Sequence, residues 1–225
     1  AAMAVAQFPF RMARRHLRPV WEPRNPSVDR IVRLSGWTVA FVMTNQVALF
    51  VVLFLANGHA GDVAVYFLAN VIFLLPHGVV AVSIITTVRT AMSERLADDD
   101  LDGFRDQVSL GIRAIAAVIV PATVGLVLLA TPIVSFLLEH GALDRNASRD
   151  VAGTLALMSL GLPFFSIWLL LTSAYQALQD TRSLFWLYGA ENAANIAAAF
   201  ALYPVMGVEG LGLAFALSYV VGTVL

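Results

Sequence analysis

The chain has 225 residues, of which 59% are hydrophobic and 13% charged, and its mean hydropathy is +0.79. Soluble domains carry about 25% charged residues, so the lipid bilayer is the expected solvent of this chain. The formal net charge of −1 excludes a polybasic nucleic-acid binder, and the absence of cysteine excludes disulfides, thiolate catalysis and cysteine metal sites.

Stretches without Asp, Glu, Lys or Arg predict the membrane spans, because a spanning helix needs about 20 mostly apolar residues. Six such windows follow one another, the fifth interrupted only by Glu191: 34–61, 63–88, 114–138, 151–179, 183–208 and 210–225. None alternates apolar and polar residues as a barrel strand would, so the sequence predicts an all-α transmembrane bundle. We expect five full spans and a truncated span at each end, in one transmembrane region (1–225) of a longer protein.

The arginines predict the orientation of the bundle, because cytoplasmic loops are enriched in basic residues. The loops 11–33, 89–107 and 177–184 hold eleven arginines, whereas the alternate loops hold two. The first three loops are therefore expected to be cytoplasmic, with 89–107 a loop or a surface helix. The segment 132–150 is expected on the outer side.

Three prolines fall near the middle of consecutive spans: Pro76, Pro121 and Pro163. Proline removes one backbone hydrogen bond and kinks a helix. The pattern favours helices that bend around a cavity or move, although proline is also commoner in membrane helices in general.

Polar residues inside the spans are the candidate functional residues, because ionisable groups at membrane depth usually face a bundle interior. Glu191 and Asn195 lie one helical turn apart, so they either bind a cation or a proton or hydrogen-bond a neighbouring helix. Asn70 and His77 share a face of the second span, where His77 is either hydrogen-bonded or a proton carrier. On another face of the Glu191 helix, small residues recur every fourth position and predict close helix packing: Gly189, Ala193, Ala197 and Ala201.

Gln46 lies inside the first span, and Arg113 lies at the cytoplasmic end of the third. Snorkelling to the headgroups explains Arg113, and contact with an anionic lipid headgroup is the alternative. The aspartates at 98, 100 and 102 mimic the start of a calcium loop, but Ser109 stands where that loop needs its glutamate. The sequence has no phosphate loop, metal-spaced histidine pair or nucleophile elbow, so nothing in it supports an enzyme or a metal site.

Four segments, in their order and spacing, resemble the MurJ/MviN family of the MOP exporter superfamily. They are LLPHGVVAVSIITTVRTAMS (74–93), PIVSFLLEHGALDRNASRDVAGTLALMSLGLPF (132–164), SAYQALQDTRS (173–183) and NIAAAFALYPVMGVEGLGLAFALS (195–218). Gln46 also fits a glutamine that recurs in the family. The resemblance places this piece from the end of the sixth helix through most of the twelfth helix of a fourteen-helix protein. Because all 14 basic residues are arginine, an actinobacterial member is expected.

The resemblance implies a flippase that moves lipid II, the lipid-linked peptidoglycan precursor, across the bacterial plasma membrane by alternating access, without covalent chemistry. It implies membrane lipid and lipid II as partners, with other cell-wall synthesis proteins, and coupling to a monovalent cation or proton rather than a cofactor. The expected cavity residues are Gln46, Asn70, His77, Arg113, Glu191 and Asn195.

This sequence departs from the family pattern at several positions, three of which concern the expected cavity. An Asp-Arg pair that family members often carry falls on Asn70 and Val71, and an acidic residue linked to cation binding in some members falls on Val52. Two rival functions therefore stay open: another MOP-type exporter, of drugs or of a different lipid-linked glycan, and a non-transporting membrane scaffold for wall-synthesis proteins.

Overall fold

The computed structural model describes helices within residues 26–138 and 145–225, and side chains within 35–138 and 146–225. The chain divides into two compact units, Ala1–Ser35 and Gly36–Leu225, and the first contributes only the beginning of one helix to the described part. The elements are α2 (Pro26–Ala56), α3 (Asp62–Pro76), the π-helical turn η1 (His77–Ala81), α4 (Val82–Ala97), α5 (Leu101–Leu138), α6 (Arg145–Ser159), α7 (Leu162–Ala177), α8 (Thr181–Met206) and α9 (Val208–Val224). The described residues form no strand, and the predicted all-α class is confirmed.

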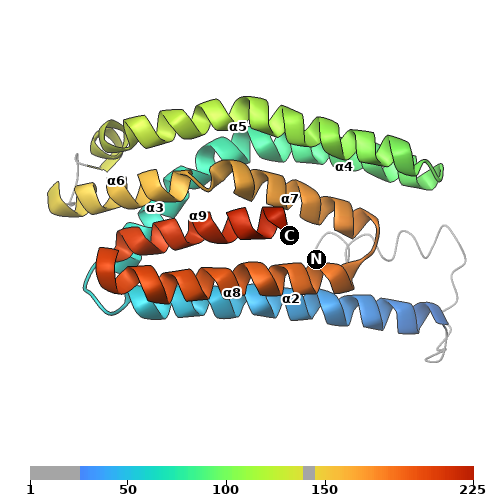
Figure 1. Cartoon of the computed structure of the whole chain (residues 1–225), viewed down its shortest axis with the longest axis horizontal. Helices are drawn as coiled ribbons and strands as arrows, with labels where there is room; N and C mark the ends of the chain where they lie inside the picture. Colours follow the sequence, from blue (N-terminus) through green and yellow to red (C-terminus); the bar gives the residue numbers. More distant parts are fainter. Residues whose placement is uncertain (1–25, 139–144) are drawn as a thin grey trace, which may run out of the picture. The chain divides into compact units, whose positions relative to one another are not determined.

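Helices of the second unit run side by side, and their turns gather at two opposite ends (Figure 1). The turns after α4 and α7 lie at one end, and those after α2 and α8 lie at the other. α8 packs along α9, and α6 contacts α3, α5 and α9. α4 and α7 both pack against the long helix α5.

The helices extend beyond the charge-free windows, because the windows mark the apolar thickness that a bilayer requires and not the ends of the hydrogen-bonded helix. The segment 89–107 is mostly the end of α4 and the start of α5, with only a short turn at 98–100, and part of 132–150 belongs to α5 and α6. In the predicted loop 11–33, α2 already begins at Pro26, a residue whose fixed φ suits a first helical position. The rest of that loop, residues 11–25, lies outside the described residues.

Three helical stretches are long and apolar enough to span a membrane: Ser35–Ala56, Asp62–Ala97 and Leu101–Leu138. A fourth span exists if α6 and α7, which are bent by 52° at their junction, are counted together. Counted by length and composition, the described residues therefore give four spans at most, against the five full spans predicted. The difference is α8, which is 26 residues long but is made less apolar by polar side chains such as Glu191, Asn192 and Asn195.

The turns after α4 and α7 share one construction that explains why both helices stop where they do. Asp99 and Gln179 adopt positive φ values of 56° and 58°, and the next residue donates its N–H to a carbonyl five positions back, as in a Schellman motif. That next residue is an aspartate in both turns, and its carboxylate caps the following helix. Two hydrogen bonds from Ser183 hold the pKa of Asp180 below its ordinary value. The bond from the Ser183 side chain has the larger effect, and the bond from its backbone N–H has the smaller one.

The three prolines predicted to kink helices lie in three different settings in the structure. At Pro76 the chain changes from α3 to the π-helical turn His77–Ala81, whereas α5 continues through Pro121 without a break. Pro163 lies in the first turn of α7, just after the bend at Leu160–Gly161, because a first turn needs no N–H from that residue. The chain therefore changes from α-helix to a π-helical turn at η1 and bends at the α6–α7 junction.

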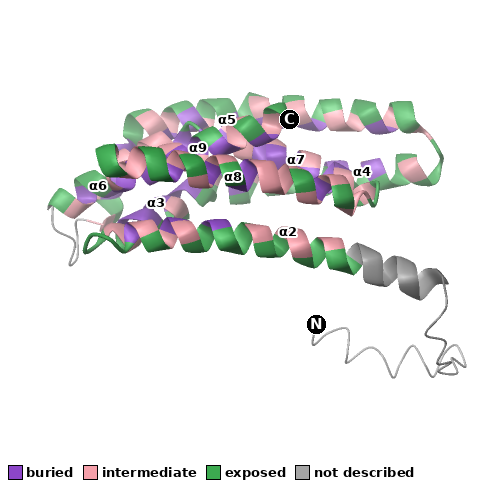
Figure 2. Ribbon diagram, turned by 60° about the horizontal axis from the view of Figure 1, so that its bottom comes forward, coloured by how far each residue is buried: buried purple, intermediate pink, exposed green. Residues whose placement is uncertain are grey.

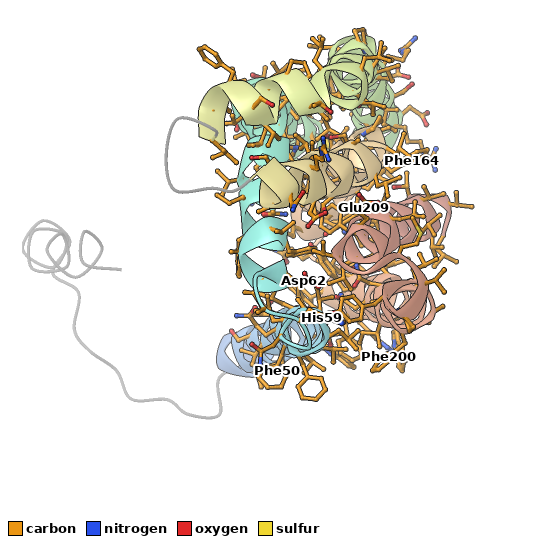
Figure 3. All side chains as sticks on the ribbon, turned by 90° about the vertical axis from the view of Figure 1, so that its left-hand side faces the viewer. Phe50, His59, Asp62, Phe164, Phe200 and Glu209 are labelled. Carbon is orange, nitrogen blue, oxygen red and sulfur yellow. The ribbon has the colours of Figure 1, made fainter. Side chains whose placement is uncertain are left out.

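Burial follows the pattern of a bundle in lipid, with buried residues on the facing sides of the helices and apolar residues on the outside (Figure 2). The interior holds the buried Trp168 and Phe73, and Phe73 lies against the rings of Phe165 and Phe215. Phe50 and Phe200 are 71% and 54% exposed and project outward from α2 and α8 (Figure 3). Hydrocarbon is a favourable surrounding for such outward-facing rings, whereas water is not.

Candidate functional site

A cavity of about 240 Å³ with a partly polar lining lies between α2, α3, α8 and α9. Its polar lining includes Asn70 from α3, and Glu191 and Asn195 from α8. All three belong to the residues expected from the sequence. The tertiary structure therefore brings together, at one cavity, polar groups that are 125 positions apart in the chain.

Glu191 and Asn195 are joined by a hydroxyl from the neighbouring helix. The Oγ of Ser218 on α9 donates to Oε1 of Glu191 over 2.9 Å and accepts from Nδ2 of Asn195 over 3.2 Å. The same Oγ lies 2.8 Å from the carbonyl of Phe215, so its single proton is shared between two acceptors. All three side chains are buried, with Glu191 only 2% exposed.

Two acceptor atoms of this cluster have no hydrogen-bond partner in the described part of the chain: Oε2 of Glu191 and Oδ1 of Asn195. A buried acceptor without a donor costs free energy, and a buried charge without a partner costs much more. A proton on the carboxyl group or a cation between the two oxygens would remove that cost. The described residues contain no group of three or more His, Cys, Asp and Glu side chains that could hold a metal ion.

The other expected residues lie elsewhere. Gln46 is exposed on α2, and its neighbour Asn45 lines the cavity in its place. His77 is buried at the start of η1, where its Nδ1 lies 3.0 Å from Oγ of Ser166 on α7 and its ring lies 4.7 Å from that of Phe165. This contact corresponds to the hydrogen-bonded alternative predicted for His77, and it joins the start of η1 to α7.

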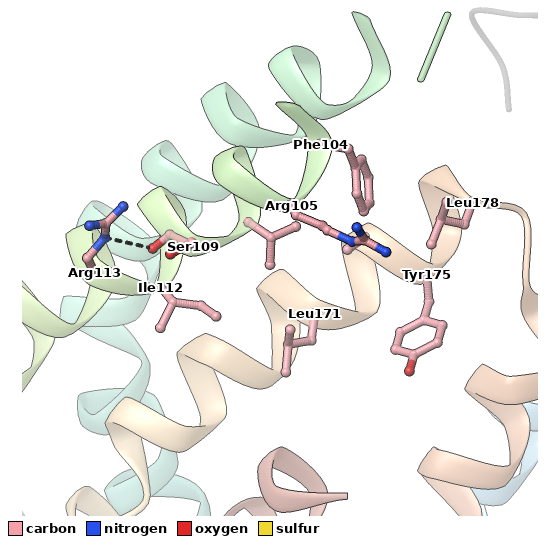
Figure 4. A pocket seen from close by; sticks show the side chains of 10 residues that line it. Phe104, Arg105, Ser109, Ile112, Arg113, Leu171, Tyr175 and Leu178 are labelled. Atoms are coloured by element: carbon pink, nitrogen blue, oxygen red, sulfur yellow. Dashed lines mark hydrogen bonds between the residues drawn. The ribbon is translucent and has the colours of Figure 1, made fainter. Parts of the chain in front are cut away.

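Arg113 lies on a different side of the bundle, in a groove between α5 and α7 (Figure 4). It is exposed, and its Nε donates to the carbonyl of Ser109 over 3.3 Å. The groove contains no residue of the Glu191 cavity. The structure therefore separates Arg113 from the other residues of the expected site.

A row of hydroxyls on α4 was not anticipated from the sequence. Its members are all exposed, and each donates to the carbonyl four positions before it: Ser83, Thr86, Thr87, Thr90 and Ser93. They lie opposite the buried face of α4, which carries Val88 and Met92. The signal was present as Ser and Thr recurring at spacings of three and four, the spacing of one helical face. Ser218 was also missed, because nothing in its own segment indicates which residue it faces.

The model of the family "Lipid II flippase MurJ" matches residues 1–225. This chain belongs to the MurJ family. The membership that the sequence segments indicated is confirmed, and MurJ proteins are integral membrane proteins, in agreement with the apolar spans described above.

Individual relatives agree with this assignment. The chain is 28% identical over 193 residues to the probable lipid II flippase MurJ of Rhizobium tropici, covering 86% of this chain and 36% of that protein. It is 29% identical over 154 residues to lipid II flippase MurJ of Thermosipho africanus, covering 68% and 31%. The chain thus spans about a third of the length of the curated relatives it matches.

Solved structures share the fold. A lipid II flippase MurJ in an inward closed conformation superposes with a TM-score of 0.75 at 25% identity, covering 82% of this chain and 39% of that one. A MOP superfamily transporter from Pyrococcus furiosus gives a TM-score of 0.73 at 15% identity, covering 87% and 43%, and shows likeness of fold alone.

Val52 stands at the position where the resemblance leads one to expect an acidic residue. It lines the same cavity as Glu191, and it is 4% exposed. The position at which the resemblance leads one to expect an acidic residue is therefore apolar here, and Glu191 on α8 is the carboxylate among the cavity-lining residues.

Proposed function

We propose that this chain is part of a lipid II flippase of the bacterial plasma membrane, acting in cell-wall synthesis by alternating access without covalent chemistry. The observation that carries the proposal is the match of the MurJ family model over residues 1–225. We also propose that the segments 11–33, 89–107 and 177–184 face the cytoplasm. Lipid II is then the substrate, and other wall-synthesis proteins are the partners of the flippase.

The Glu191 cluster is proposed as the site at which transport is coupled to a proton or a monovalent cation. Oε2 of Glu191 and Oδ1 of Asn195 are the acceptors that lack a donor, and Ser218 holds both side chains in place. Both acceptors belong to α8, and Ser218 of α9 fixes the positions of their side chains, so the affinity of the site changes when the two helices shift. Binding and movement are then linked in both directions.

We propose that alternating access involves a rocking motion of the helices, which uses the π-helical turn η1 and the bend between α6 and α7. The π-helical turn at His77–Ala81 and the 52° bend between α6 and α7 are connected by the hydrogen bond between His77 and Ser166. π-turns and helix breaks leave backbone groups that can change partners, so they are the natural places for a helix to flex.

The test of function uses the full-length gene in bacteria depleted of their own lipid II flippase. The fraction of lipid II accessible to a cleaving reagent in the outer leaflet is measured, together with growth. Restored accessibility is expected for the natural protein and a loss of at least tenfold for Glu191→Gln, which keeps the shape of the side chain but cannot carry the charge. Glu209→Gln, in the first turn of α9 and outside the cavity lining, is the matched control and should retain transport.

Three outcomes separate the alternatives. If Glu191→Gln transports like the natural protein while present in the membrane, Glu191 has no part in coupling. If the natural protein, well expressed, restores neither growth nor accessibility, the lipid II proposal fails. A different lipid-linked substrate or a scaffold role would then account for the departures at Asn70, Val71 and Val52.

A further inference from the structure

A groove of about 390 Å³ lies between the first half of α5 and the last half of α7, on a different side of the bundle from the Glu191 cavity. Its floor is apolar and is formed by Val108 and Ile112 of α5 with Leu171 and Ala174 of α7. The groove opens near the end of the bundle at which the turns after α4 and α7 lie.

Two guanidinium groups line this groove, and its lining contains no carboxylate. Arg105 extends from α5 toward α7, and Arg113 lies slightly more than two turns further along α5, about 80° around the helix axis (Figure 4). Arg105 pairs with Asp102 over 3.0 Å, but side-chain exposures of 75% and 91% make this ion pair weak in water. In Arg113, the Nε–H donates to the carbonyl of Ser109. The terminal NH₂ groups of its guanidinium take no part in that bond.

The depth of the groove matches the boundary of the bilayer. Arg105 and Arg113 are eight residues apart, which is about 12 Å along a helix. The charge-free stretch 114–138 begins directly after Arg113, so Arg113 marks the level at which hydrocarbon starts. The headgroup layer on one side of a bilayer is roughly 5–8 Å thick, and the two guanidinium groups therefore bracket it.

We propose that this groove binds an anionic phospholipid of the surrounding bilayer, with the phosphate between Arg105 and Arg113 and an acyl chain over the apolar floor. Arginine presents a planar fork of donors that matches phosphate oxygens, and the carboxylate that pairs with Arg105 belongs to the exposed Asp102, outside the groove lining. The floor gives the acyl chain a surface between helices at hydrocarbon depth. The proposal requires α5 to span the membrane, but it does not depend on lipid II translocation.

The test measures phospholipid retention by native mass spectrometry of the full-length protein, released from vesicles of phosphatidylcholine and phosphatidylglycerol in a 4:1 ratio. Retention of phosphatidylglycerol above its share of the mixture is expected. Each basic group near an anionic surface contributes about fivefold to binding, so Arg105→Gln with Arg113→Gln should reduce that preference by roughly 25-fold. Arg95→Gln with Arg182→Gln removes the same charge at the same end of the bundle outside the groove and should leave the preference intact.

A second variant keeps both arginines and fills the floor. Ile112→Trp should reduce retention of phosphatidylglycerol as strongly as the double arginine variant, and it covers the case in which that variant fails to fold. Equal loss in the control pair would show a general charge effect and would overturn the proposal. Equal retention of the two lipids by the natural protein would show an apolar contact without headgroup recognition and would also overturn it.

Discussion

Ser218 holds the polar cluster together, because one hydroxyl serves both Glu191 and Asn195. Its side chain is fully buried between α8 and α9. The two helices meet side by side, so a change at this residue is felt on both. The cluster therefore depends on Ser218, although neither acceptor atom proposed to bind the cation or proton belongs to that residue.

Replacing Ser218 by alanine is expected to lower the free energy of unfolding by about 1–3 kcal/mol, because the carboxyl group of Glu191 and the amide of Asn195 both lose a buried partner. The measurement is thermal unfolding of the full-length protein in detergent. Ser83→Ala is the matched control, since Ser83 is exposed and bonds only to the carbonyl of Val79 within its own helix. Equal changes in the two variants would contradict the role assigned to Ser218.

At the scale of the helices, close approach is made by glycines that the sequence pattern did not single out. A Cβ on Gly161 would lie 2.6 Å from the Cα of Ala216, and one on Gly212 would lie 2.8 Å from the carbonyl oxygen of Thr154. These contacts bring the α6–α7 junction against α9. The small-residue row on α8, predicted to pack, does not do so within the described chain, because its three alanines are exposed and a Cβ on Gly189 would meet nothing within 4 Å.

Gly161→Ala is therefore expected to destabilise the protein by about 1–3 kcal/mol, because the new methyl group meets backbone that cannot move aside. Gly189→Ala should be neutral or stabilise by up to about 1 kcal/mol, since alanine favours a helix over glycine. Midpoints of thermal unfolding for the two variants and the natural protein check this pair. If Gly161→Ala proves as stable as Gly189→Ala, the α6–α7 junction packs more loosely against α9 than these distances indicate.

At the scale of the whole unit, the turns after α4 and α7, which the arginines predict on one side of the membrane, lie at one end of the bundle. The turn after α2 is tied to the end of α8, because His59 Nδ1 lies 2.8 Å from the hydroxyl of Tyr203, which donates to Asp62 over 3.0 Å. His59 and Asp62 lie near one another at this end (Figure 3). The turn after α4 lies at the opposite end of the bundle.

Single cysteines test this orientation, because the 225 residues contain none of their own. Ala60→Cys should react with a membrane-impermeant maleimide in intact cells stripped of their wall, and Asp98→Cys should react only in inverted vesicles. Both positions are exposed. The reverse pattern of labelling would show that the arginine-rich side faces outward.

The sequence by itself determined the solvent, the helical class and the family, because each depends on composition and on local order along the chain. It also identified Glu191, Asn195 and Asn70 as costly polar groups in apolar helices. Only the tertiary structure decided that these three share a cavity, that Ser218 joins two of them, and that His77 and Arg113 lie apart from it. The physical reason is that helical periodicity fixes which face a residue occupies, whereas the helix opposite that face is set by packing between segments far apart in the chain.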